Sequence, residues 1–257
     1  MHKIPYTNSY YLTERRPATT FFPSLNFYLN LFCIIYRASR FAKKGRYDGS
    51  DWMESSYEVM QQLEKIGIRI EISGIENLVA AEGPVVIIGN HMSMMETLLL
   101  PVMIQPIKPV TFVVKESLLA YPVFKYVMRS RNPITVTRTN PRQDLKTVLK
   151  EGLGKLQNGM SIIVFPQTTR SHAFDAKQMS SIGVKLAKNA GVPIVPLALK
   201  TDCWQNGKKF KDFGRLNPNK KAHYAFGPAL KVADKGEAEH AAINAFITGK
   251  LQQWGSR

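Results

Sequence analysis

The sequence of 257 residues has few cysteines, few acidic residues and no apolar run long enough to cross a membrane. Its two cysteines, Cys33 and Cys203, lie far apart, which excludes a disulfide framework and a zinc site built on C-x-x-C pairs. The five histidines show no H-E-x-x-H spacing, so we expect no metal site. A G-x-S-x-G motif is also missing, which argues against a covalent serine mechanism.

The shortage of acidic residues leaves a large positive charge. The chain has 35 Lys and Arg residues against 19 Asp and Glu residues, a formal net charge of +16. An excess of this size favours an anionic partner, either a nucleic acid or an anionic lipid surface, although each basic patch could also be a solvated face. Because no zinc-finger, RNA-recognition or basic-zipper pattern accompanies the charge, we expect no nucleic-acid partner.

The N-terminal region favours the lipid surface. Residues 1–20 are polar, and we expect a frayed tail there. Residues 25–36 form an apolar, aromatic-rich run that is shorter than the ~20 residues a spanning helix needs, and a basic segment, residues 37–46, follows it. This order is typical of a helix lying in one leaflet of a membrane, although a helix packed on the domain would also fit. We therefore interpret residues 21–66 as a helical, membrane-associating extension of two helices.

The remaining residues, 67–257, alternate between strand and helix signals, which predicts one α/β domain with a mostly parallel central sheet flanked by helices. Short apolar segments indicate strands at residues 68–72, 85–88, 110–114, 134–136, 162–165 and 194–199, with a late edge strand at 224–226. Helical spacing predicts helices at residues 51–65, 97–102, 117–128, 141–157, 178–189 and 237–254.

The segment from Asn90 to Glu96 is the most informative one, because it places a histidine at the end of a predicted buried strand. A carboxylate that orients His91 would make it a general base, and Glu96 reaches it only if His91 lies in the turn before a helix and Glu96 in its first turn. Two other interpretations remain open. Ser93 and Glu96 also fit an S-x-x-E capping box, and a lone histidine beside an apolar strand is often bonded only to a backbone carbonyl.

Three further segments change that balance. They are the K-E-S-L-L segment at residues 115–119 with an arginine at 138, the F-P-Q-T-T-R-S segment at 165–171, and V-P-I-V-P at 192–196. Together with N-H-x-S-x-x-E at residues 90–96, the four blocks resemble the glycerolipid acyltransferases of the lysophosphatidic acid acyltransferase type in order and spacing. The chain departs from the family pattern at Glu96, where Asp is usual, at Lys125, where Gly is common, and at Gln167 and Thr168, where Glu and Gly are usual.

The resemblance implies a function and a set of site residues. An acyl group would pass from a thioester to the hydroxyl of a lysophospholipid, with His91 as the general base and Glu96 as the residue that orients it. Arg170 would bind the acceptor phosphate because its guanidinium donates in bidentate fashion. The residues expected to bind substrate are Lys115, Arg138, Phe165, Pro166, Gln167, Thr168, Thr169 and Arg170.

The resemblance also sets expectations about partners. The acceptor would be 1-acylglycerol-3-phosphate, and the changes at Gln167 and Thr168 leave open a lyso-aminolipid acceptor or a lipid-binding protein without turnover. The donor would be acyl-CoA or acyl carrier protein, and no cofactor is expected. We expect a monomer that binds an anionic membrane surface on the cytoplasmic face, which is the inner membrane if the chain is bacterial.

Overall fold

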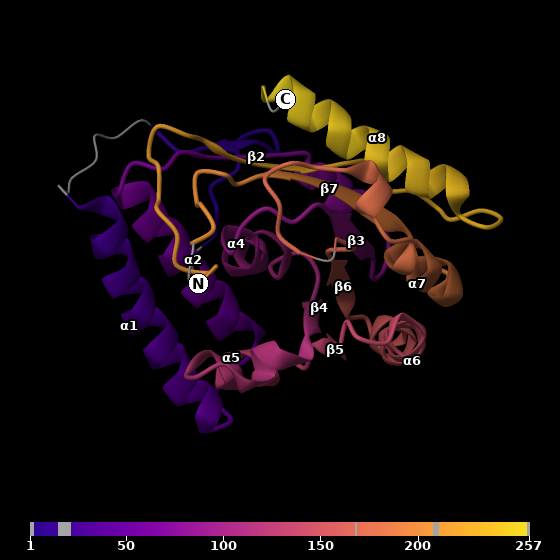
Figure 1. Ribbon diagram of the computed structural model, residues 1–257, viewed down its shortest axis with the longest axis horizontal. Coiled ribbons are helices and arrows are strands. Elements are labelled where there is room, and N and C mark those ends of the chain that lie inside the picture. Colours follow the sequence, from indigo (N-terminus) through magenta and orange to yellow (C-terminus); the bar gives the residue numbers. More distant parts are fainter. Residues whose placement is uncertain (1–2, 15–21, 168, 208–210, 256–257) are drawn as a thin grey trace.

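The computed structural model describes residues 3–14, 22–167, 169–207 and 211–255. Within this part of the chain an eight-stranded sheet has the order β1-β2-β8-β7-β3-β6-β4-β5. Neighbouring strands are parallel except at β1–β2 and β7–β8. The expected mostly parallel sheet flanked by helices is therefore confirmed (Figure 1). The strands are β1 (Tyr11–Leu12), β2 (Ile70–Ser73), β3 (Val86–Gly89), β4 (Val110–Lys115), β5 (Ile134–Val136), β6 (Ser161–Val164), β7 (Ile194–Lys200) and β8 (Ala222–Phe226).

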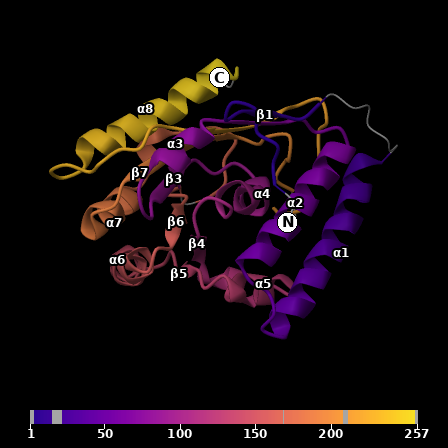
Figure 2. The same cartoon turned by 180° about the vertical axis from the view of Figure 1, so that it is seen from behind.

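Helices cover both faces of this sheet, and the figures separate them into two groups (Figure 2). Two short 3-10 helices, η1 (Glu116–Ala120) and η2 (Ala176–Gln178), lie in the connections after β4 and β6. The α-helices are α1 (Pro23–Lys43), α2 (Gly49–Lys65), α3 (Ile75–Ala80), α4 (Met95–Ile104), α5 (Phe124–Ser130), α6 (Pro141–Gln157), α7 (Ile182–Ala190) and α8 (Glu237–Gln253).

Alternate residues of the central strands divide the core into two layers. On β3, Ile87 belongs to the layer covered by α1, α2 and α4, whereas Val86 and Ile88 belong to the layer covered by α6, α7 and α8. All four residues of β3 are buried, which explains why the strand reads as a continuous apolar run. The strand is therefore fixed within the sheet, and the turn that follows it begins at residue 90.

Several local expectations are wrong for identifiable reasons. The frayed tail expected at residues 1–20 does not hold for residues 3–14, because Tyr11 and Leu12 pair with β2 and Ile4 is buried. The strand at 224–226 is not an edge strand, since β8 lies between β2 and β7. The helix expected at 117–128 is divided into η1 and α5, because Pro122 lacks the N–H that a continuous helix needs.

The N-terminal helices α1 and α2 pack side by side at one end of the molecule (Figure 1). One face of α1, which includes Phe27, Leu31 and Ile34, is buried. The opposite face carries the exposed apolar side chains of Phe22 and Leu25 and further exposed apolar residues after them. Both faces of this helix are therefore apolar. No helix in the described residues is long and apolar enough to span a membrane.

Candidate active site

The turn after β3 brings His91 and Glu96 together. The His91 Nδ1 atom lies 3.0 Å from the Glu96 Oε2 atom. The Glu96 side chain is fully buried, whereas 15% of the His91 side chain is exposed. Glu96 stands in the first turn of α4 and reaches back to His91, as the sequence predicted. With Nδ1 bound to the carboxylate, Nε2 is the ring nitrogen left for a substrate.

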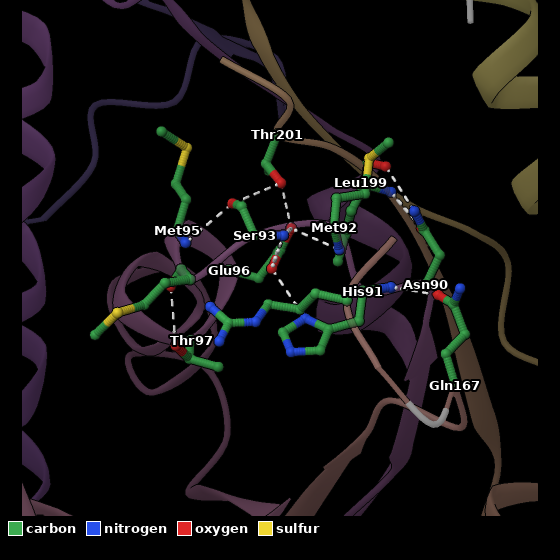
Figure 3. A network of polar contacts seen from close by, with 12 residues as sticks. Asn90, His91, Met92, Ser93, Met95, Glu96, Thr97, Gln167, Leu199 and Thr201 are labelled. Carbon is green, nitrogen blue, oxygen red and sulfur yellow. Dashed lines mark hydrogen bonds and ion pairs between the residues drawn. The ribbon is translucent and has the colours of Figure 1, made fainter. Parts of the chain in front are cut away.

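Glu96 also accepts from backbone N–H groups of the turn before its helix, which is the part of the capping-box interpretation that the structure retains (Figure 3). Its carboxylate accepts from the Ser93 N–H at 2.9 Å and from the Met92 N–H at 3.2 Å. The Ser93 hydroxyl accepts from the Met95 N–H at 3.1 Å and not from the Glu96 N–H, and the helix has Met94 as its N-cap, so the expected capping box is not complete. The Thr201 hydroxyl, at the end of β7, donates to the same carboxylate. A buried carboxylate with these donors stays fixed beside the imidazole.

The backbone of the turn is tied to both neighbouring strands of β3. The Asn90 amide accepts from the Leu199 N–H and donates to the Leu199 carbonyl, both at 2.8 Å, so its side chain continues the pairing with β7. On the β6 side, Gln167 Oε1 accepts from the His91 N–H at 2.6 Å. The Ser171 N–H donates to the His91 carbonyl at 2.9 Å. These bonds fix the position of the His91 Cα, and hence the origin of its side chain.

The Phe165 ring orients the imidazole further. It stacks on His91 with ring centroids 4.4 Å apart and an angle of 5° between the planes. Phe165 also packs against Phe112 of β4, which holds the stack in place. The ring therefore limits the imidazole's rotation and keeps it in line with Glu96.

His91 opens into a cavity of about 600 Å³. Most of its wall is apolar and comes from α1, α2, α4, β4 and α5, with Leu31, Trp52, Leu98, Phe112 and Val127 among the lining residues. The same wall also contains cationic residues. The cationic rim consists of Lys115, Arg138, Arg170 and Lys211. One cavity thus joins a basic nitrogen, a positive rim and an apolar chamber.

Two cations of the rim have identified side-chain partners. The Arg170 guanidinium donates to Asp212 at 2.5 Å, and both side chains are less than one-fifth exposed. Lys211 donates to the Thr169 hydroxyl at 3.1 Å. Burial lowers the pKa of the Arg138 guanidinium, Asp144 raises it, and the nearby Arg170 lowers it again. Two guanidiniums close enough to affect each other favour an anion between them.

The residues expected to bind substrate divide into three groups. Lys115, Arg138, Thr169 and Arg170 line the cavity with His91. Phe165, Pro166 and Gln167 do not line it, and Phe165 and Gln167 instead contact His91. Thr168 lies outside the described residues.

Sequence reasoning missed Asp212, Lys211 and Thr201, which come from β7 and the connection after it. These residues lie more than 100 positions after His91 and belong to none of the four blocks, so only the fold brings them to the site. Thr201 had a weak signal, because a hydroxyl stands directly after the predicted strand 194–199 and its neighbour.

Comparison with known proteins decides the family. Residues 69–200 match the model of a protein family described as Acyltransferase. The chain belongs to this acyltransferase family. The matched residues include all four sequence blocks and the whole His91 turn, so the family's characteristic segments coincide with the site described above.

Individual members of the acyltransferase family are similar to this chain over part of their length. A 1-acyl-sn-glycerol-3-phosphate acyltransferase of Pseudomonas aeruginosa is 31% identical over 69% of this chain and 65% of that protein. A chloroplastic enzyme of the same name from Brassica napus is 28% identical over 51% of this chain and 37% of its own. The chain thus spans less than two thirds of these relatives. The crystal structure of the 1-acyl-sn-glycerophosphate (LPA) acyltransferase from Thermotoga maritima has the same fold, with a TM-score of 0.64, 20% identity, and coverage of 91% of this chain and 95% of that chain.

Proposed function

We propose that the protein transfers a fatty acyl group from a thioester donor to the hydroxyl of a lysophospholipid, and that its acceptor is 1-acylglycerol-3-phosphate. The observation that carries this proposal is the His91–Glu96 pair in a cavity whose wall contains both cationic and apolar residues. An acceptor with a phosphate, a hydroxyl and a long acyl chain presents groups that match these three features. Relatives named as 1-acyl-sn-glycerol-3-phosphate acyltransferases support the choice of acceptor.

The proposed reaction needs no covalent enzyme intermediate. His91 Nε2 takes the proton of the acceptor hydroxyl while its oxygen attacks the thioester carbonyl carbon. The tetrahedral intermediate then collapses, the C–S bond breaks, and the leaving thiolate takes the proton from the imidazolium. Glu96 holds the imidazole in the tautomer with its proton on Nδ1 and stabilises the positive charge that forms between the two steps.

Substrate binding follows the division of the cavity. Arg170 and Arg138 bind the acceptor phosphate, with Lys115 as a further cation at the end of β4. An acyl chain enters the apolar chamber between α1, α2 and α5, where its burial contributes roughly 0.8 kcal/mol per methylene. The donor is either acyl-CoA or acyl carrier protein, and neither requires a cofactor.

Asp212 supports a second acceptor class. Its carboxylate lies in the cavity wall and pairs with Arg170, so the rim offers a negative group beside a positive one. A lyso-aminolipid could place its ammonium group at Asp212, whereas a phosphate would compete with Asp212 for Arg170. A panel of acceptors separates these two cases.

Mass spectrometry of products tests activity and acceptor together. The protein is mixed with vesicles, acyl-CoA or acyl carrier protein, and one lysolipid at a time: 1-acylglycerol-3-phosphate, a lyso-aminolipid and a neutral monoacylglycerol. We expect the diacyl phosphate product with the wild type and none with His91→Ala. Binding of lysolipid without any product would instead identify a lipid-binding protein. A preference for the lyso-aminolipid would show that it, and not 1-acylglycerol-3-phosphate, is the acceptor.

We also propose that the outer face of α1 lies in the interface of an anionic membrane, on the cytoplasmic side, with the protein as a monomer. Phe22, Leu25, Leu29, Phe32 and Tyr36 follow helical spacing and are each at least half exposed. The basic residues that follow them are also exposed, which suits contact with anionic headgroups (Arg37, Arg40, Lys43, Lys44 and Arg46).

Sedimentation with anionic vesicles tests this attachment. The triple variant Leu25→Ser, Leu29→Ser, Phe32→Ser should lose most of its vesicle binding, because each side chain contributes roughly 1.5–3 kcal/mol when it leaves water. Val79→Ser on α3 is the matched control, since Val79 is exposed but lies on another helix. Equal sedimentation of the triple variant and the wild type would contradict the proposal.

A further inference from the structure

A second cavity, of about 520 Å³, lies at the same edge of the sheet as His91 but has a different lining. Strand β7 ends there at Lys200, which pairs with His223, the second residue of the antiparallel β8. Its wall is almost entirely polar, unlike that of the apolar chamber. The lining residues are Met92, His172, Lys200, Asp202, Asn219, Lys220, Lys221, His223, Trp254 and Gly255.

Lysines dominate the charge of this lysine-lined cavity. Lys200, Lys220 and Lys221 belong to its wall, and Asp202 is the carboxylate among the described lining residues. Asp202 pairs with Lys220, and Glu71 of β2, outside the lining, pairs with Lys221 at 2.8 Å. The set keeps a positive excess after both pairs are counted. A concave polar space with positive excess favours an anionic ligand rich in hydrogen-bond acceptors.

One wall of the cavity is flat and aromatic. The Trp254 indole stacks on the His223 imidazole with ring centroids 4.8 Å apart and an angle of 20° between the planes. The Lys200 ammonium donates to the Trp254 carbonyl at 2.6 Å, which anchors the end of α8 beside the end of β7. A fixed aromatic pair beside lysines could support a ring of the ligand as well as its phosphates.

The lysine-lined cavity lies directly behind the catalytic turn. Met92, the residue after His91, and His172, two residues after Arg170, are both in its wall. Asn206 joins them, because its amide donates to the Met92 carbonyl at 3.0 Å and lies 3.3 Å from His172 Nε2. The two cavities therefore flank one turn, and a ligand with an extended arm could occupy one while its reactive end reaches the other.

We propose that the lysine-lined cavity binds the phosphorylated nucleotide of a coenzyme A thioester, the acyl donor. This inference rests on the proposed function, since acyl transfer needs a second substrate and the cationic rim serves the acceptor. A concave, polar space of this size suits the phosphates and base of a nucleotide. An acyl carrier protein would need an extended surface of about 800 Å² instead. The assignment therefore also selects between the two donors.

Kinetics with palmitoyl-CoA at saturating acceptor test the site. Lys220→Gln and Lys221→Gln should each raise the donor KM about three- to five-fold, and the double variant about tenfold, as expected for partly exposed charge pairs. The acceptor KM should stay within about two-fold, because neither lysine lines the cavity that contains His91. The matched control is Lys146→Gln with Lys150→Gln, which removes the same charge from exposed positions on α6.

Calorimetry with free coenzyme A gives a readout that does not require turnover. The wild type and His91→Ala should bind coenzyme A equally, and the Lys220→Gln, Lys221→Gln double variant should bind it about tenfold more weakly. Coenzyme A binding that the lysine variants leave unchanged would overturn the site while the acyltransferase function stands. Turnover with acyl carrier protein alone, with no coenzyme A binding, would show that the ligand is not coenzyme A. Lysine-dependent coenzyme A binding in a protein without turnover would support the site and contradict the proposed function.

Discussion

The catalytic turn and the cationic rim face the same cavity but are held in different ways. In the turn, the Glu96 carboxylate has donors from His91, two backbone N–H groups and Thr201, and its side chain is fully buried. On the rim, Arg170 pairs with Asp212, and Lys115 is exposed to solvent. One region is fixed before substrate arrives, whereas the other can change its ion pairs.

This difference matches the two tasks. A general base must hold its nitrogen within hydrogen-bond reach of one atom, and small displacements are costly. A phosphate site needs positive charge that can exchange one anion for another, so the Arg170–Asp212 pair is a suitable resting state. We expect substitutions in the turn to lower kcat and substitutions on the rim to raise KM.

The largest expected effect comes from His91→Ala, which removes the base. We expect kcat/KM for acyl transfer to fall at least ~10³-fold, because the imidazole that takes the hydroxyl proton is removed. The measurement is product formation by mass spectrometry under initial-rate conditions. His240→Ala on α8 is the control, since it removes an imidazole away from the cavity. A fall of less than tenfold would show that His91 is not the base.

Glu96→Gln separates the two roles that Glu96 combines. The amide oxygen can still accept from Met92, Ser93 and Thr201, so we expect the free energy of unfolding to fall by only about 1–2 kcal/mol. The amide nitrogen would face Nδ1 as a donor and place the imidazole proton on Nε2, the wrong tautomer for a base. Turnover should therefore fall about 10²-fold or more.

Thermal unfolding and initial rates measure these two outcomes separately, with Glu76→Gln on α3 as an exposed control. Near wild-type turnover in Glu96→Gln would show that the carboxylate serves only as a helix cap.

On the rim, Arg170→Lys should raise the acceptor KM about tenfold and change the donor KM little. Lysine keeps the charge but loses the bidentate geometry of the guanidinium. Arg142→Lys on α6 makes the same exchange at an exposed position and should change neither constant. A rise in the donor KM alone would show that Arg170 does not bind the acceptor phosphate.

Much of the fold could be predicted from the sequence because its signals are local. The buried strand before residue 90 and the helix at Pro141–Gln157 have continuous apolar or helical patterns, and Asn140 caps the helix by accepting from the Gln143 N–H. The position of β8 between β2 and β7 has no local signal in the sequence, so residues 224–226 were predicted to be an edge strand. The same holds for Asp212, which reaches Arg170 only through the connection after β7.

The site was predictable where one short segment contains both partners and unpredictable where two segments meet. His91 and Glu96 lie five positions apart, so one turn before a helix can bring them together, and the further sequence blocks favoured that interpretation. Gln167 lies 76 positions from His91, and its place in the family motif suggested contact with the acceptor. In the structure its side chain is turned toward the His91 backbone and is 4% exposed.

The smallest expected effect tests that new position of Gln167. Gln167→Leu removes the oxygen that accepts from the His91 N–H, so we expect kcat to fall about three- to tenfold while the acceptor KM stays within two-fold. Gln167→Glu keeps an acceptor oxygen at the same place and should retain more activity than Gln167→Leu. Steady-state kinetics in both substrates measure the difference. If Gln167→Leu instead raises the acceptor KM with kcat unchanged, Gln167 belongs to the rim, and the division between a fixed turn and an adjustable rim is wrong at this residue.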